Sequence, residues 1–282
     1  MSASAVLRRR PKASPEGWVA GALVAAPLAL LFGGTVWELI QDWAVDPEYG
    51  HGFLMLPIAV VLAWKKRLSR PRPATVTGLL LLAVAVAVFL LGVLAAEYFT
   101  RRMAMLLALG ALSVYYLGWA QARAWWLPFG LLAFSVPLPE VVLNSLTLPL
   151  QLFASEIAVG LLQFRHIPAA QVGNIIFLPG QELFVAEACS GLRSVSALLG
   201  LTLLIAGTTL RSVPGRAALL ALALPAAIAA NTLRVFATGF GAYYLGPAFA
   251  TGATHTILGI VVFVLPLAFV GLLTVLVGKV ER

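Results

Sequence analysis

Long stretches without Asp, Glu, Lys or Arg recur along the chain, and most of them have nearly the length of a transmembrane helix. A helix needs about 20 apolar residues to cross a hydrocarbon core of about 30 Å. Shorter stretches can also cross when flanking basic side chains reach the interface. The expected spans are 18–37, 49–64, 74–96, 103–122, 124–139, 194–210, 217–233 and 256–278. The pattern therefore predicts an all-α polytopic membrane protein with about eight transmembrane helices.

Residues 141–164 differ from these stretches because polar residues interrupt them. The interruptions are Asn144, Pro149, Gln151, Glu156 and Gln163. A charged side chain at mid-bilayer is costly, which disfavours a span here. We expect an amphipathic helix that lies in the interface. If 141–164 spanned instead, every later loop would change sides, and the distribution of basic residues does not decide between the two topologies.

The next segment, "QVGNIIFLPGQELFVAEA" at 171–188, contains two short β-prone runs around Pro179-Gly180. A Pro-Gly pair suits a tight turn, so the segment predicts a small β-hairpin. Lipid cannot satisfy the polar edges of a hairpin, which must therefore lie in water or against protein. We expect the hairpin on the extracytoplasmic side.

The composition agrees with a membrane protein: 61% of the residues are hydrophobic and 11% are charged, against about 25% charged residues in a soluble domain. The net charge of +8 could indicate nucleic acid, but basic residues of a polytopic protein mainly anchor its cytoplasmic loops. We therefore expect membrane lipids and no nucleic acid as partners. Residues 1–17 are expected to form a disordered cytoplasmic tail, and 18–282 a single transmembrane domain.

Three residues with reactive or ionisable side chains lie at span boundaries. Cys189, the single cysteine of the chain, precedes one span, Arg234 ends the next span, and His255 precedes the last. All three therefore share one side of the membrane whichever way 141–164 is placed. Ionisable residues at membrane depth are functional candidates by default.

This combination of side chains suits acyl transfer. A thiolate is the reactive form of cysteine, and a helix N-terminus or a nearby cation favours it. The imidazole of His255 could take the thiol proton and later protonate a leaving amine. The guanidinium of Arg234 could stabilise the oxyanion of a tetrahedral intermediate.

Each residue alone has a simpler explanation. A lone cysteine in a membrane protein is usually a small buried apolar side chain. An arginine near the end of a span usually extends toward lipid phosphates, and a histidine at a helix start is often a cap. These explanations do not account for the shared side of all three residues, nor for the Ser190-Gly191 pair that follows the thiol.

Neighbouring residues could support such a site. Ser190 and Gly191 permit close approach of the backbone to a substrate. Asn231 precedes Arg234 by three residues, so both lie on one face of a helix. Asn231 could therefore orient the guanidinium or contact the substrate backbone.

Three further polar residues have weaker claims to a functional role. Glu187 and Arg193 flank the thiol, and a structural ion pair or a contact with lipid headgroups explains them better than catalysis. For His51, in "EYGHGF", a structural role at the interface and contact with a substrate are equally good explanations.

Five motifs carry a family resemblance. "EACSGLRS" with Cys189, "NTLRVF" with Arg234 and "THTILG" with His255 resemble the three signature regions of the exosortase and archaeosortase family of membrane transpeptidases. "YGHGFLMLPI" and "FSVPLPE" are similar to further landmarks of that family. The likeness extends from about residue 45 to residue 270, and "FSVPLPE" favours the bacterial exosortase branch, with archaeal origin left open.

The resemblance implies a multi-pass enzyme of the bacterial inner membrane whose active site faces the periplasm. Its substrates would be exported proteins with a C-terminal sorting tail of the PEP-CTERM type: a Pro-Glu-Pro signal, an apolar helix and a basic cluster. Cys189 would be the nucleophile of this thiol protease, Arg234 the oxyanion stabiliser and His255 the acid/base. An accessory protein of an exopolysaccharide export system is a further expected partner.

Two other functions would use some of the same residues. A transporter or lipid-carrier channel could line a polar path with Arg234, His255 and Glu156, but the two halves of the chain show no repeat and the cysteine would have no role. A metalloprotease is disfavoured because His51, His166 and His255 form no His-Glu-X-X-His pattern. We expect no metal and no cofactor.

Overall fold

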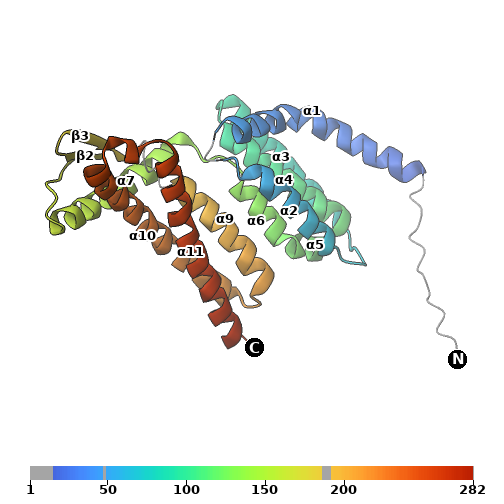
Figure 1. Ribbon diagram of the computed structural model, residues 1–282. Helices are drawn as coiled ribbons and strands as arrows, with labels where there is room; N and C mark the ends of the chain where they lie inside the picture. Colours follow the sequence, from blue (N-terminus) through green and yellow to red (C-terminus); the bar gives the residue numbers. More distant parts are fainter. Residues whose placement is uncertain (1–14, 47–48, 186–191, 282) are drawn as a thin grey trace.

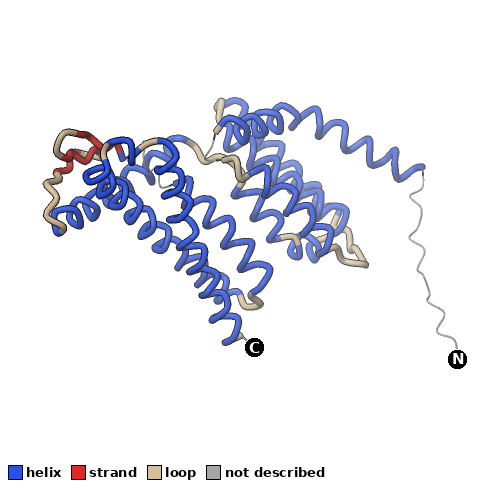
Figure 2. The backbone as a smooth tube through the Cα atoms, in the orientation of Figure 1, coloured by secondary structure: helices blue, strands red, loops and turns tan. Residues whose placement is uncertain are grey.

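A computed structural model describes residues 15–46, 49–185 and 192–281. It is mostly helical, with a small antiparallel sheet at one end (Figures 1 and 2). The helices are α1 (Pro15–Val45), α2 (Gly52–Lys65), α3 (Thr75–Leu94), α4 (Tyr98–Leu117), α5 (Trp119–Ala124), α6 (Trp126–Phe134), α7 (Glu140–Phe164), α9 (Leu192–Thr209), α10 (Val213–Leu245) and α11 (Gly252–Val280). The strands are β1 (Ala170–Val172), β2 (Ile175–Leu178) and β3 (Gln181–Phe184), and the 3₁₀-helix η1 (Pro247–Ala250) joins α10 to α11.

The first six helices form an N-terminal bundle. Its core between α1, α3 and α4 combines two phenylalanines in edge-on contact, Phe32 and Phe89, with small residues such as Ala85 and Ala108. Small residues let helix backbones approach closely, which is how helices associate in lipid. Residues 1–14 of the predicted tail at 1–17 lie outside the described residues, and α1 begins at Pro15.

Two ion pairs fix α1 to the start of α4. Arg101 donates to Glu38 at 3.1 Å, and Arg102 donates to Asp42 at 2.6 Å. Arg102 is 4% exposed, so Asp42 supplies the counter-charge that a buried guanidinium requires. The start of α4 is capped by Glu97, which accepts from the backbone N–H groups of Phe99 and Thr100.

The C-terminal bundle consists of α9, α10 and α11, which lie side by side in Figure 1. Its core contains Leu198 of α9, Leu219 of α10 and Val270 of α11. A separate core of Met55, Leu127, Leu131 and Leu203 joins this bundle to α2 and α6. The two bundles therefore pack through α9.

The predicted hairpin is present as β2 and β3, which pair antiparallel around Pro179-Gly180 with Gly180 at φ +77. The sequence interpretation missed β1, which pairs with β2 through a turn at Gly173, where φ is +61. Positive φ costs glycine little, so this turn closes within two residues. The sheet has three strands in the order β1-β2-β3.

The sheet packs on α7 and on the last part of α10. The shared core includes Ala158 and Leu162 of α7, Ile176 of β2, and Val235 and Ala242 of α10. The expectation that the span ends at Arg234 is wrong for the helix itself, because α10 continues to Leu245. The continuation is helical since it buries one face against α7 and the sheet, and it ends at Gly246, where φ is +91.

Among the described helices, four are long and apolar enough to cross a membrane: α3, α7, α10 and α11. The expectation of about eight spans is therefore not confirmed. Helices occupy the other predicted spans, but α2 has 14 residues and α6 has 9, and α4 carries Arg101 and Arg102 within its first two turns. Length and composition do not separate an interfacial from a spanning α7, so its interfacial position stays a prediction.

Candidate functional site

Arg234 of α10 and His255 of α11 meet where the two helices pack together. The Nη2 atom of Arg234 lies 2.8 Å from Nε2 of His255. The two residues are 21 positions apart in the chain, and the short connection through η1 folds α11 back along α10. The structure thus brings together two of the three residues to which the sequence assigns chemistry.

The hydrogen bond fixes the protonation of the imidazole. A guanidinium has five N–H donors and no acceptor, so Nε2 of His255 must accept from Arg234. An imidazole that accepts at Nε2 is neutral and carries its proton on Nδ1. In this arrangement the lone pair of Nε2, with which His255 would act as a base, accepts the hydrogen bond from Arg234.

Gly259 provides the room for this contact. It follows His255 by one helical turn, so both residues face the same side of α11. A Cβ atom at position 259 would lie 3.0 Å from Nη2 of Arg234 and 3.3 Å from its Cζ. Because carbon and nitrogen atoms pack comfortably at about 3.5 Å or more, glycine allows the guanidinium to rest against α11.

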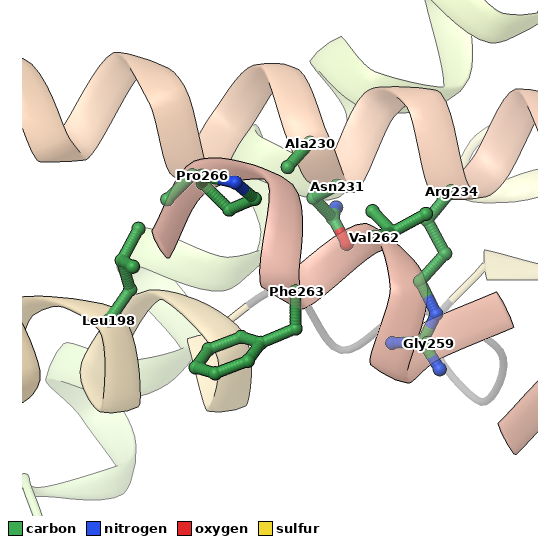
Figure 3. Close-up of a pocket in the computed structure, with 9 residues that line it drawn as sticks. Leu198, Ala230, Asn231, Arg234, Gly259, Val262, Phe263 and Pro266 are labelled. Atoms are coloured by element: carbon green, nitrogen blue, oxygen red, sulfur yellow. The ribbon is translucent and has the colours of Figure 1, made fainter. Parts of the chain in front are cut away.

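Asn231 completes the described part of the site. It is 6% exposed, and Figure 3 shows its side chain and that of Arg234 extending from α10 toward the part of α11 with Gly259 and Val262. A small cavity of about 10 Å³ lies beside them. The cavity is lined by Leu198, Ala227, Ala230, Asn231, Arg234, Gly259, Val262, Phe263 and Pro266.

A model of the transmembrane exosortase family matches residues 43–272, a range that contains Asn231, Arg234, His255 and Gly259. The chain belongs to the transmembrane exosortase family. No curated protein and no solved structure matches it. The family consists of proteases and transpeptidases of the membrane. This exosortase is accordingly a multi-pass membrane protein of an enzyme family that processes sorting signals.

Four of the residues predicted for the site lie outside the described part of the exosortase: Glu187, Cys189, Ser190 and Gly191. Arg193 belongs to α9, whose backbone alone is described at that position. The helix that follows Cys189 in the sequence, α9, packs on both α10 and α11, the helices that carry Arg234 and His255. Its Leu198 lines the same cavity as Arg234.

His51 lies in the N-terminal bundle, at the start of α2. Its Nε2 is 3.3 Å from the backbone oxygen of Phe134 at the end of α6, and its ring lies 6.3 Å from that of Tyr49. These contacts join α2 to α6. They agree with a structural role of His51, and its contact with a substrate stays a prediction.

Sequence reasoning missed Gly259 as a residue of the site. The signal was present, because "THTILG" places a glycine four residues after His255, on the same helical face. A glycine inside an apolar helix lowers helix stability relative to alanine, which suggests a reason in packing. Only the structure identifies that reason as the guanidinium of Arg234.

Proposed function

We propose that this exosortase is a membrane-embedded cysteine protease/transpeptidase that cleaves the C-terminal sorting tail of exported proteins. The tail would combine a Pro-Glu-Pro type signal, an apolar helix and a basic cluster. Cys189 is the nucleophile, His255 the acid/base and Arg234 the oxyanion stabiliser. The observation that carries the proposal is the 2.8 Å contact between Arg234 and His255 across α10 and α11, which unites an acid/base group with an oxyanion donor.

The first half of the reaction forms a thioester. His255 takes the proton of the Cys189 thiol on Nε2, and the sulfur attacks the carbonyl carbon of the scissile peptide bond. Negative charge develops on the carbonyl oxygen, where it is stabilised by the guanidinium of Arg234, which the bound substrate has already drawn away from Nε2. The C–N bond then breaks, the tail leaves as an amine protonated by His255, and the remaining protein stays bound to sulfur as an acyl group.

The second half releases the acyl group. An acceptor amine or water attacks the thioester carbon, the C–S bond breaks, and the proton of the attacking group returns through His255 to the sulfur. Arg234 again stabilises the oxyanion. An amine acceptor gives transpeptidation and water gives hydrolysis.

The displacement of Arg234 follows from its hydrogen bond. With Nε2 occupied, His255 cannot accept the thiol proton, so activation requires that the guanidinium leave the imidazole. The carbonyl oxygen of a bound substrate offers a competing acceptor. We propose that this exchange keeps the thiol unreactive until a substrate enters.

We further propose that the enzyme lies in a bacterial inner membrane with the site facing the periplasm. Figure 1 places the start of α11 at one end of the C-terminal bundle, and the first turn of this helix contains His255. The basic loop at 66–72 and the last turn of α11, with Lys279, lie at the opposite end of the helices. Basic residues favour the cytoplasmic side, which supports this orientation. An accessory protein of an exopolysaccharide export system is the proposed partner besides the substrate.

Replacement of the nucleophile tests the proposal. In cells that express the exosortase with a precursor bearing a sorting tail, Cys189→Ala and Cys189→Ser should abolish processing, because neither side chain supplies a thiolate. The variants must still fractionate with the membrane at the wild-type level. Thr256→Ala, an exposed neighbour of His255, is the control and should process normally. Processing by Cys189→Ala at the wild-type rate would refute the proposed function.

A further inference from the structure

Among the residues that the structure describes, two buried polar atoms beside the Arg234–His255 contact have no hydrogen-bond partner. They are Oδ1 of Asn231 and Nε of Arg234. One is an acceptor and the other a donor. Buried polar groups are nearly always hydrogen-bonded, so both atoms require an explanation.

Both residues line the cavity of about 10 Å³ described above. They are three residues apart on α10 and therefore lie on one face of the helix. The remaining wall is apolar, with Leu198 of α9 and Val262, Phe263 and Pro266 of α11. With respect to the described residues, the cavity thus offers one donor and one acceptor between otherwise apolar walls.

The volume of the cavity limits the ligand to the size of a water molecule. A water molecule needs about 10–15 Å³ of such volume and at least two polar partners. A larger ligand, such as a carboxylate or part of a substrate, does not fit this space. An empty cavity would be expected only if its walls were wholly apolar.

We propose that one structural water occupies this cavity and joins Asn231 to Arg234. The water donates a hydrogen bond to Oδ1 of Asn231 and accepts one from the Nε–H of Arg234. Asn231 is thereby a positioning residue: through the water it fixes the plane of the guanidinium whose Nη2 faces His255. The kinetic consequence rests on the proposed function, whereas the water itself does not.

The Nε–H proton of Arg234 reports directly on the water. In the full-length exosortase, labelled with ¹⁵N-arginine in detergent micelles, this signal is assigned by its loss in Arg234→Lys. We expect a cross-peak from the Nε–H to water and exchange with solvent at least tenfold slower than for the exposed Arg165. Fast exchange, or the absence of a water cross-peak in the wild-type protein, would overturn the proposal without any variant.

Variants at position 231 then test the role of the asparagine. Asn231→Leu has a similar shape but no acceptor, and it should remove the water cross-peak. Asn231→Asp keeps an acceptor oxygen and should retain the cross-peak. The matched control is Thr232→Val on the same helix, because the hydroxyl of Thr232 bonds to the backbone oxygen of Ile228 and does not line the cavity. An unchanged cross-peak in Asn231→Leu would contradict the proposed bridge.

Kinetics with a tail-bearing precursor separate positioning from folding. Asn231→Leu should lower kcat about tenfold to a hundredfold with KM within twofold, because misorientation of a catalytic group affects mainly the chemical step. Asn231→Asp should recover most of the rate, and Thr232→Val should match the wild-type protein. If the water signal behaves as expected but Cys189→Ala still processes the precursor, the water site stands and the proposed function fails.

Discussion

Gly259→Ala perturbs the site without replacing any of its reactive side chains. The new Cβ atom would lie 3.0 Å from Nη2 of Arg234, about 0.5 Å closer than a comfortable contact. The guanidinium must therefore move away from α11, and the 2.8 Å hydrogen bond to His255 lengthens or breaks. A hydrogen bond to a charged group contributes about 1.5–3 kcal/mol, and a misplacement of this order in an active site lowers rates by up to about a hundredfold.

The same change should alter the stability of the fold only modestly. The helix preference of alanine over glycine, about 0.5–1 kcal/mol, offsets part of the weakened hydrogen bond, so thermal unfolding in detergent should occur at or slightly below the wild-type temperature. Gly271→Ala is the matched control, because it lies on the same helix and no heavy atom stands within 4 Å of its added Cβ. It has the same gain in helix propensity without touching Arg234.

The assay compares precursor processing by the two variants at equal amounts in the membrane. Gly259→Ala should process about tenfold to a hundredfold more slowly than Gly271→Ala, which should match the wild-type protein. Equal rates for the two variants would refute the argument that Gly259 sets the position of the guanidinium. Loss of Gly259→Ala from the membrane, or its unfolding at the assay temperature, would assign the defect to folding instead.

Two predictions concern the N-terminal bundle. Asp42→Asn removes the counter-charge of the buried Arg102 and should lower the free energy of unfolding by about 1–3 kcal/mol. The control is Glu156→Gln, which is exposed on α7 and should change the free energy of unfolding little. Equal stabilities of the two variants would show that the ion pair is dispensable. For Glu97, burial raises the pKa, but hydrogen bonds from Thr100 and Phe99 outweigh burial and leave the pKa below the usual 4.5. Glu97→Ala should therefore lower the free energy of unfolding by about 1 kcal/mol at pH 7. A carboxylate whose pKa is lowered by folding contributes its full stabilisation only at pH values above its pKa in the unfolded state. The loss caused by Glu97→Ala should therefore shrink as the pH falls below 4.5. A loss that does not change with pH would contradict the capping role.

The helices and the turn at Pro179-Gly180 were predictable because they depend on local pattern. Apolar runs of the right length predict helices, and a Pro-Gly pair between β-prone runs predicts a hairpin. The end of α10 was not predictable in this way. The residues after Arg234 remain helical because Val235 and Ala242 pack on α7 and the sheet, and a pattern confined to α10 does not contain those partners.

The approach of Arg234 and His255 was predictable in part. Their common side of the membrane follows from the order of the spans, and a contact between them is one of several arrangements that this order allows. The 2.8 Å hydrogen bond, the neutral state of the imidazole that it requires, and the role of Gly259 depend on how α10 and α11 pack. Those details come from side-chain geometry, which spacing in the sequence does not determine.

The central claim is that the substrate is transferred to the sulfur of Cys189 while Arg234 stabilises the carbonyl oxygen and His255 transfers the protons. Mass spectrometry of the full-length exosortase, quenched in acid during a single turnover, tests it most directly. The account predicts an adduct on the peptide that contains Cys189, equal in mass to the precursor without its tail and removable by hydroxylamine, which should be much weaker in Arg234→Gln. Processing without any adduct on Cys189, or with an adduct on another residue, would contradict the account.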